Sequence, residues 1–237
     1  METKKKNHDA LQEFAYSAGA LAFGVCDIRE VKKSFPLSAA AREGLDYAVC
    51  VAVGLSKKIL EGIVDKPTKL YFHHYRQANN LLDHISMRIT GYLQSSGYQA
   101  LPIPASQIVD WQKQTAHLSH KRLAELAGIG WLGRNNLIVH PRYGAQMRLT
   151  TVLTDMPLAV DTKLARGCSD CRECVTVCPA GAIKDSQSDF DHHACFEKLK
   201  LFQKERLVDQ YICGVCVKAC LPDFARPRGK AGCGKAT

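Results

Sequence analysis

The amino-acid sequence predicts an α+β fold in two parts, a mixed helix-and-strand domain over residues 1–163 and a cysteine-rich domain over residues 164–237. Two observations support this prediction. Apolar residues in the first part recur alternately with the periods of helices and of strands. Eight of the 11 cysteines fall between residues 168 and 220, which indicates that this part is organised around cysteine chemistry. With 237 residues and 46% hydrophobic content, the chain suits one large or two modest globular domains.

The elements of the first part follow from hydrophobic spacing and from the residues at their ends. Between residues 71 and 93, apolar side chains recur at steps of three and four, which predicts one long amphipathic helix ended at Gly97. Ser119 is a suitable N-cap for a helix that runs to Gly128. The other expected elements are a helix at residues 8–19, strands at 21–28, 46–55, 98–102 and 146–154, and a link at 155–167.

Three glycines lie between that second helix and an apolar segment that predicts a strand. Gly128, Gly130 and Gly133 match the pattern G-x-G-x-x-G. They follow a helix and precede a strand, which is the reverse of the order in dinucleotide-binding folds, so a dinucleotide site is excluded. Two interpretations stay open: the glycines let the backbone approach a ligand closely, or they make a tight connection between helix and strand.

The run from Cys168 to Pro179 has the bacterial ferredoxin spacing C-x2-C-x2-C-x3-C-P. Three thiolates in such a loop can each reach a different iron of a 4Fe-4S cube, while the fourth serves a second cube. Cys195 and the segment 213–222 supply the remaining thiolates. The crossed arrangement of two-cluster ferredoxins predicts a first cysteine group of Cys168, Cys171, Cys174 and Cys220, and a second group of Cys178, Cys195, Cys213 and Cys216.

Cys195 departs from the simple ferredoxin pattern because it lies far upstream of Cys213. Residues 192–206 predict a helix inserted between the two, which lengthens the loop without removing a ligand. Zinc is disfavoured because it takes four ligands, commonly as two separated pairs. Disulfides are disfavoured because they need an oxidising compartment, and no apolar signal segment follows residues 1–9.

Three cysteines lie outside the two groups. Cys26 and Cys50 sit in apolar runs, where a cysteine is commonly a small buried hydrophobic residue. Cys233 lies in a glycine-rich tail and is expected to be exposed. None of the three is expected to bind metal.

The charge of the chain leaves its partners open. The formal net charge is +9, and residues 197–237 carry nine Lys or Arg against four Asp or Glu. Two oxidised cubes with eight thiolates would carry about four negative charges, which balances part of this excess. The rest is compatible with tRNA, phosphate-bearing cofactors or no specific partner, since the longest basic block is Lys4–Lys6. The longest apolar run, Tyr47–Leu55, is far shorter than the roughly 20 residues of a membrane-spanning helix, so a cytoplasmic protein is expected.

The glycine turn and the two cysteine blocks together resemble the superfamily of epoxyqueuosine reductases and corrinoid reductive dehalogenases. The resembling stretches are AGIGWLGRNNLIVHPRYG, CSDCRECVTVCPAGAI, the isolated Cys195, and YICGVCVKACLP. The resemblance covers residues 70–222, and the displaced Cys195 agrees with it. It implies a nitroreductase-like α/β sandwich domain that binds cobalamin with its lower base detached. It also implies a double-cluster ferredoxin-like domain that feeds electrons singly from a low-potential donor such as ferredoxin or flavodoxin.

The same resemblance implies which residues line the corrinoid. They belong to the glycine turn and to the segment 144–151, with two arginines available for amide and phosphate groups of the corrinoid. For each arginine, a solvated surface charge is the alternative. The implied residues are Gly128, Gly130, Trp131, Gly133, Arg134, Asn135 and Arg148.

Two features of the chain depart from the epoxyqueuosine reductases. Their proton-donating Asp lies in a Val-Asp-Thr-Gly-Pro run, and that family's spacing leads to Gln114 in this chain, whereas Asp110 lies four residues earlier without the Gly-Pro. Asp110 is therefore the first candidate for the general acid. The tRNA-modifying enzymes also continue into a helical-repeat domain, whereas the sequence stops at Thr237, which weakens tRNA as a partner. The other candidates for the acid are His117, His120 and Tyr143.

Three functions follow as hypotheses. The first is a cobalamin- and iron-sulfur-dependent reductase of a small molecule or a modified nucleoside. The second is an electron carrier or reductive activator of a partner corrinoid protein, without a substrate of its own. The third is a flavin-dependent reductase that holds FMN, because nitroreductase-like domains commonly bind flavin.

Overall fold

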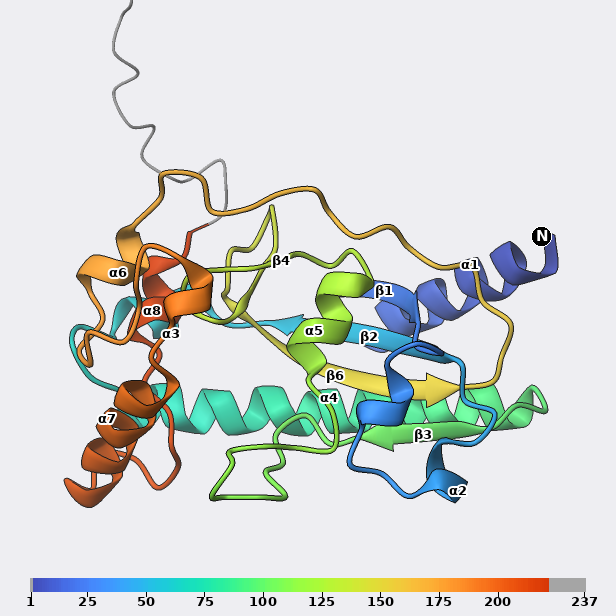
Figure 1. Ribbon diagram of the computed structural model, residues 1–237, viewed down its shortest axis with the longest axis horizontal. Coiled ribbons are helices and arrows are strands. Elements are labelled where there is room, and N and C mark those ends of the chain that lie inside the picture. The colour runs from blue at the N-terminus through green and yellow to red at the C-terminus, as the bar shows by residue number, and fades with distance from the viewer. Residues whose placement is uncertain (1, 222–237) are drawn as a thin grey trace, which may run out of the picture.

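The computed structural model describes residues 2–221, so Cys233 and the end of the chain lie outside it. Its centre is a four-stranded sheet with the order β1-β2-β6-β3, in which every strand pair is antiparallel. The strands are β1 (Ala22–Asp27), β2 (Tyr47–Gly54), β6 (Met147–Thr154) and β3 (Ala100–Ile103). Figure 1 shows the sheet with α4 along one face and α5 on the other. The α+β class predicted from the sequence is confirmed, and each strand lies within two residues of its predicted place.

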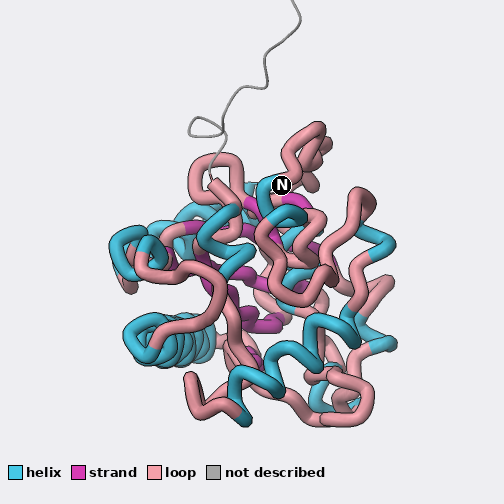
Figure 2. Tube along the Cα trace, turned by 90° about the vertical axis from the view of Figure 1, so that its left-hand side faces the viewer, coloured by secondary structure: helices cyan, strands magenta, loops and turns pink. Residues whose placement is uncertain are grey.

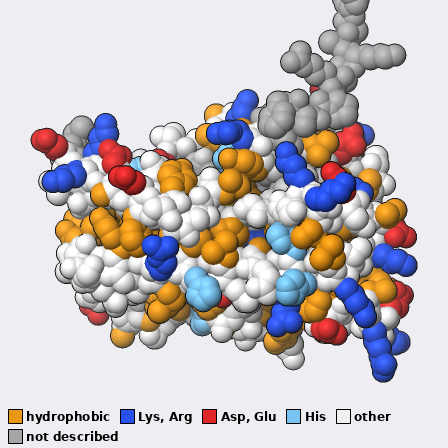
Figure 3. Space-filling view, turned by 180° about the vertical axis from the view of Figure 1, so that it is seen from behind, with side chains coloured by type: hydrophobic (Ala, Val, Ile, Leu, Met, Phe, Trp, Pro, Cys, Tyr) orange, Lys and Arg blue, Asp and Glu red, His pale blue; other side chains and the backbone are white. Residues whose placement is uncertain are grey.

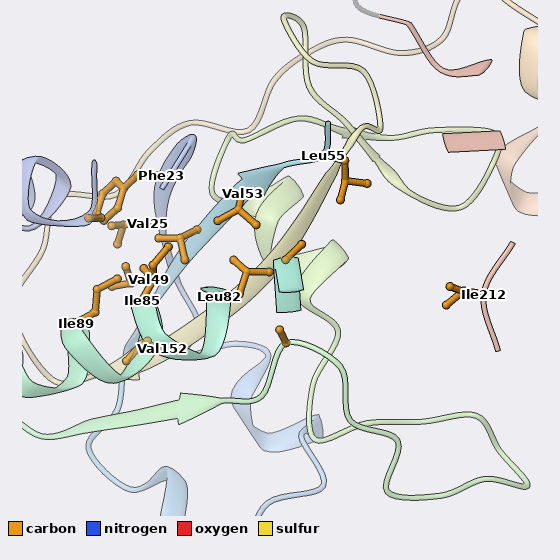
Figure 4. Close-up of a cluster of buried hydrophobic side chains, with 14 of the residues drawn as sticks. Phe23, Val25, Val49, Val53, Leu55, Leu82, Ile85, Ile89, Val152 and Ile212 are labelled. Atoms are coloured by element: carbon orange, nitrogen blue, oxygen red, sulfur yellow. The ribbon is translucent and has the colours of Figure 1, made fainter. Parts of the chain in front are cut away.

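One face of the sheet is covered by two amphipathic helices, α1 (Glu2–Ser17) and α4 (Lys69–Ser95). The long helix predicted for residues 71–93 is confirmed, with Thr68 as its N-cap. Leu82, Ile85 and Ile89 of α4 are fully buried against strand residues such as Val49 and Val152 (Figure 4). Each such side chain contributes roughly 1.5–3 kcal/mol to the stability of the fold, which holds α4 firmly on the sheet.

The opposite face of the sheet is covered by α5 (His120–Leu126) and by the loop residues Phe35 and Leu45. The short helices η1 (Lys32–Ser34) and α2 (Ala39–Arg42) bury no residue of their own. Ser119 caps α5 as predicted, since its side chain accepts a hydrogen bond from the Arg122 N–H at 3.3 Å. Cys26 and Cys50 are buried in this face, which confirms that they are small core residues. Figure 2 shows the strands in the interior of the molecule with helices and loops around them.

The glycine-rich segment differs from its prediction. Instead of a turn that feeds one strand, it forms a small hairpin of β4 (Trp131–Leu132) and β5 (Ile138–Val139). The first strand thus begins between the glycines themselves. Such a two-residue strand is too short to show a period in the sequence.

The cysteine-rich part consists of short elements connected by loops. They are α6 (Glu173–Thr176), η2 (Gln187–Asp189), α7 (His192–Lys204) and α8 (Val215–Ala219), and α3 (Lys57–Glu61) packs beside α8. The helix predicted for residues 192–206 is confirmed as α7. Phe202, Ile212 and Val215 of this part belong to the same buried cluster as α4, so the two parts of the chain share one core.

On the face of the molecule drawn in Figure 3, charged side chains of both signs are interspersed. Hydrophobic side chains lie between them (Figure 3). None of the helices within residues 2–221 is both long and apolar enough to cross a membrane.

Candidate functional site

The first three cysteines of the first group lie on one tight loop that leads into α6. Ser169 has a φ of 46°, and the Cys171 N–H donates to Cys168 O at 3.0 Å, so the backbone turns sharply between the first two thiols. Burial, followed by the nearby charges of Cys168 and Cys171, raises the pKa of the Cys174 thiol to about 11. The three side chains are therefore neighbours in space as well as in sequence.

The fourth cysteine of the first group, Cys220, follows α8 and meets the same region from another direction. Cys168 and Cys220 both pack against a small cluster formed by Trp131, Val139 and Ala145. The turn before β6 also contacts this end of α8, because a Cβ atom at Gly144 would collide with the carbonyl oxygen of Cys220. The backbone thus brings Cys220 to the side of the loop where Cys168 lies.

The second cysteine group draws on three separate places in the chain, because Cys213 and Cys216 share one loop. Burial raises the pKa of Cys213 to about 11, and Cys195 and Cys178 are among the neighbours whose charges contribute. Burial also raises the pKa of Cys216 well above its ordinary value, with Cys213 and Cys195 as the next causes. Cys195 reaches this group from α7, so the inserted helix leaves it beside the others.

The chemistry of these donors fits iron-sulfur cubes better than a single ion. Within residues 2–221, no three or more His, Cys, Asp or Glu side chains converge as one metal ion requires. The thiolates of a 4Fe-4S cube bind four different irons, so they are spaced more widely than the ligands of one ion. Buried thiols of raised pKa become thiolates when a bound cation compensates their charge.

Arg134 connects the hairpin to the cysteine loop. Its guanidinium donates to three carbonyl oxygens, from Nε to Asp185 at 2.6 Å, from Nη1 to Cys171 at 2.9 Å and from Nη2 to Ser169 at 2.7 Å. The sequence suggested a corrinoid ligand, yet the structure commits the guanidinium to this loop. The fork of donors on arginine suits such a set of fixed acceptors.

The glycine turn is filled by the chain's own atoms. A Cβ atom at Gly128 would lie 2.5 Å from Thr162 O, and one at Gly130 would collide with Val139 O. Trp131 and Asn135 are only 3% and 4% exposed. The geometry favours the tight connection over an open cradle, and the corrinoid contacts that the resemblance implied for these residues stay a prediction.

Arg148 is placed differently, in a partly buried polar site between β6 and α4. Its guanidinium carbon lies 4.3 Å from the centre of the Tyr75 ring, and its Nε donates to Asn79 Oδ1 at 3.0 Å. The Tyr75 hydroxyl lies 3.4 Å from Ser106 Oγ. Burial alone would raise the pKa of Tyr75, but the charge of Arg148 and hydrogen bonds to its hydroxyl outweigh burial and lower that pKa.

Sequence reasoning found Arg148 but missed Tyr75 and Asn79. Tyr75 occupies an apolar position in the period of the helix predicted for residues 71–93, and that period does not indicate a role for its hydroxyl. The available signal was the step of four between Tyr75 and Asn79, which places two polar groups on the buried face of the helix.

Tyr71 lies between this polar site and the second cysteine group. The ring centres of Tyr71 and Tyr75 are 6.3 Å apart. On its other side, a Cβ atom at Gly214 would lie 2.6 Å from Tyr71 Cε1, so the backbone between Cys213 and Cys216 packs directly on the ring. One aromatic side chain therefore separates Tyr75 from the loop that carries two cysteines.

Two further basic side chains, His120 and Lys121, adjoin the polar site. His120 Nδ1 lies 2.9 Å from Thr151 Oγ1, and its Nε2 lies 3.0 Å from Pro104 O. Burial is the main cause that lowers the pKa of His120 to about 4, so this side chain is neutral at neutral pH. Burial also lowers the pKa of Lys121, whereas the charge of Cys195 acts to raise it, which places Lys121 near the second cysteine group.

The sequence-based proton donor Asp110 lies away from these contacts. Its Oδ1 accepts hydrogen bonds from the backbone N–H groups of Gln112 and Lys113, both at 3.0 Å. Its side chain is 38% exposed. Asp110 therefore stabilises its own turn, and its role as an acid stays a prediction. Of the other candidates, His117 Nδ1 lies 3.3 Å from Pro36 O, and Tyr143 packs on the ring of His140.

Known proteins resemble this chain in sequence and in fold. An epoxyqueuosine reductase of Listeria monocytogenes is 41% identical over 69 residues, which are 29% of this chain and 18% of that protein. The structure of epoxyqueuosine reductase from Streptococcus thermophilus aligns with a TM-score of 0.61 and 19% identity, over 89% of this chain and 64% of that one. The catabolic reductive dehalogenase NpRdhA aligns with a TM-score of 0.65 and 21% identity, over 77% and 26% of the two chains. No protein-family model matches the chain.

The chain is thus similar in sequence to epoxyqueuosine reductases over 29% to 48% of its length, and similar in fold to an epoxyqueuosine reductase and a reductive dehalogenase. The two structural likenesses establish the fold alone, because their sequence identities are low. The matches to curated relatives span 18% to 31% of the lengths of those proteins. These similarities support a reductase, while the cofactors, substrate and partners of this chain are matters for proposal.

Proposed function

We propose that the protein is an iron-sulfur reductase that carries two 4Fe-4S clusters, one on each cysteine group. The observation that carries the proposal is the approach of eight thiols in two groups, the second of them one tyrosine ring away from the polar site of Tyr75 and Arg148. When bound, such clusters supply electrons singly at low potential.

The N-terminal part of the chain holds the ligand loops in place. Arg134 fixes the loop of the first group through three carbonyl oxygens. Gln146 Nε2 donates to Lys218 O at 3.1 Å, and Lys218 Nζ donates to Ile63 O, so the C-terminal end of α8 is tied to the N-terminal part of the chain. These contacts order the ligand loops before metal arrives.

The polar site beside the second group is the proposed place of reduction. The superfamily relationship makes a corrinoid the first candidate for the electron acceptor there, with FMN as the alternative. Arg148 is the residue from the corrinoid prediction that still fits this role, because it lies in the polar site. Tyr75 is a better proton donor than Asp110, since its lowered pKa brings the phenol closer to neutral pH.

The substrate proposed is a small molecule or a modified nucleoside, and the electron source is a low-potential protein such as ferredoxin or flavodoxin. Binding of tRNA is a secondary proposal that rests on the net charge of +9. A pure electron carrier, which would activate a partner corrinoid protein, uses the same two clusters without a bound acceptor.

Metal and cofactor analysis after oxygen-free purification tests the proposal. We expect about eight irons per chain together with cobalt. About eight irons without cobalt would support the electron carrier, and about eight irons with released FMN would support the flavin reductase. Protein that folds but binds no iron after reconstitution would refute the iron-sulfur proposal itself.

Ultraviolet titration of the tyrosines tests the proton donor. We expect one tyrosine to ionise below the ordinary pKa of about 10, and Tyr75→Phe to remove that component. Arg148→Met should shift the component to higher pH, because the positive charge that favours the phenolate is gone. Asp110→Asn is the control and should leave it unchanged. A titration curve unaffected by Tyr75→Phe would contradict the assignment.

A further inference from the structure

Asn135 carries a buried polar group that the proposed function has not used. The residue is only 4% exposed, and its Oδ1 accepts a hydrogen bond from the Leu137 N–H at 3.2 Å. Its Nδ2 is buried and has no hydrogen-bond partner among the described residues. Leaving such a group unpaired costs about 1–3 kcal/mol, so the position implies an acceptor that the protein atoms do not provide.

The first cysteine group borders the same space. A Cβ atom at Gly133 would lie 2.9 Å from Asn135 Oδ1 and 3.5 Å from Cys168 Sγ. The same Cβ position would lie 2.6 Å from Val139 Cγ2, so only glycine fits there, and the Asn135 amide and the Cys168 thiol both lie against this glycine. The buried side chains of Trp131 and Val139 pack against Cys168 beside it.

We propose that the Asn135 amide donates a hydrogen bond to a sulfur of the first 4Fe-4S cluster, either Cys168 Sγ or an adjoining sulfide, and thereby raises the reduction potential of that cluster. The inference rests on the proposed function, because the acceptor is a sulfur of the bound cluster. Sulfur atoms gain negative charge when the cluster is reduced, so a donor stabilises the reduced form more than the oxidised form. Hydrogen bonds to the sulfurs are among the factors that set such potentials.

Asn135 is thus a positioning and tuning residue, without contact to substrate. A raised potential at the first cluster would help it accept electrons from an external donor. The second group has a different environment, with Lys121 and Tyr71 as neighbours. The two clusters are therefore expected to differ in potential, and Asn135 is one cause of that difference.

The test is a redox titration of the iron-loaded full chain followed by electron paramagnetic resonance. Asn135→Leu keeps a similar volume and removes the donor. Asn135→Asp keeps the shape and replaces the donor with an acceptor. In Asn135→Leu, we expect the ratio of oxidised to reduced first cluster at a fixed potential to rise about tenfold. This corresponds to a reduction potential lowered by ~59 mV for a one-electron couple. Asn135→Asp should lower the reduction potential further. The second cluster should not shift.

Controls separate tuning from structural damage. Asn80→Leu and Asn80→Asp make the same changes on an exposed position of α4 and should leave both potentials unchanged. Cys195→Ala assigns the signals, because it should retain the first cluster alone. In deuterated water, the first cluster of the original protein should show an exchangeable deuteron coupling that Asn135→Leu loses and Asn135→Ser, a shorter donor, restores in part.

Each remaining outcome counts against the proposal. Unchanged potentials in Asn135→Leu with full iron content would overturn it, and so would equal shifts of both clusters. Asn135 would be a purely structural residue if Asn135→Leu lost iron while Asn135→Asp kept both the deuteron coupling and the reduction potential of the original protein. Failure of the proposed function is distinguishable, because the original protein would then lack the clusters before any variant is made.

Discussion

Arg134 offers a sharp test, because the structure and the family resemblance give its guanidinium different partners. The structure shows three hydrogen bonds of 2.6–2.9 Å from one guanidinium to the carbonyl oxygens of Asp185, Cys171 and Ser169. Two of the three bonds are exposed to solvent, so we take about 1 kcal/mol for each. Arg134→Met should then weaken the docking of the cysteine loop by about 3 kcal/mol, which is roughly a hundredfold.

The expected consequence is faster loss of iron from the first cluster. The assay follows cluster absorbance in the presence of an iron chelator, together with total iron and cobalt. Arg134→Lys should be intermediate, because one ammonium group can satisfy only part of a fork of three acceptors. The second cluster should be released at the original rate.

Arg172 supplies a matched control from the same loop. Its guanidinium forms an exposed ion pair with Asp185 at 3.1 Å, and exposed pairs contribute about 0–1 kcal/mol. Arg172→Met should therefore change iron release little. If Arg134→Met lost cobalt while it kept all iron at the original release rate, Arg134 would be a corrinoid ligand and the reasoning from its carbonyl contacts would be refuted.

Three other predictions test single features. Cys171→Ala should lower the bound iron from about eight to about four, whereas Cys26→Ala should leave it unchanged; equal losses would contradict the ligand assignment. Gly144→Ala should cause loss of iron from the first cluster, because the new Cβ collides with Cys220. Gly44 is also in a left-handed conformation but has open space around it, so Gly44→Ala should lower the free energy of unfolding by only about 1–2 kcal/mol. The pKa of His120 is about 4 in the folded state and near 6.5 in the unfolded state, so the unfolded state binds the proton first and the free energy of unfolding should fall as pH drops from about 6.5 to about 4. In urea unfolding, His120→Gln should reduce this loss of stability, and an unchanged pH dependence would contradict the burial argument.

The fold was largely predictable because its elements repeat a pattern over many residues. Helix α4 places an apolar side chain at every turn. The start of α5 is marked by its N-cap Ser119, and its end by the glycine that follows. The hairpin of β4 and β5 escaped prediction because its strands have two residues each. Its shape depends on contacts with Thr162 and Val139, which no local pattern reveals.

The candidate site was also predictable only in part. The cysteine spacing predicts the two cysteine groups, because a tight loop must bring its own thiols together. The polar site of Tyr75, Asn79 and Arg148 depends on how a helix lies across a strand, and the separation of these residues along the chain hides it. Arg134 was likewise predicted as a corrinoid ligand, and only the folded chain shows that carbonyl oxygens of the cysteine-rich part lie beside its guanidinium.

The shared core explains why the cysteine groups can serve the polar site. Ile212 and Val215 pack in the same buried cluster as Tyr71 of α4, and Gly214 contacts the Tyr71 ring directly. The loop of Cys213 and Cys216 therefore cannot move away from Tyr71 without opening a part of the core that also supports the sheet. Since Tyr75 is one helical turn from Tyr71, the distance from the second cysteine group to the polar site is set by core packing rather than by a linker. A flexible electron carrier would gain nothing from this rigidity, whereas a reductase that must deliver an electron and a proton to one place depends on it.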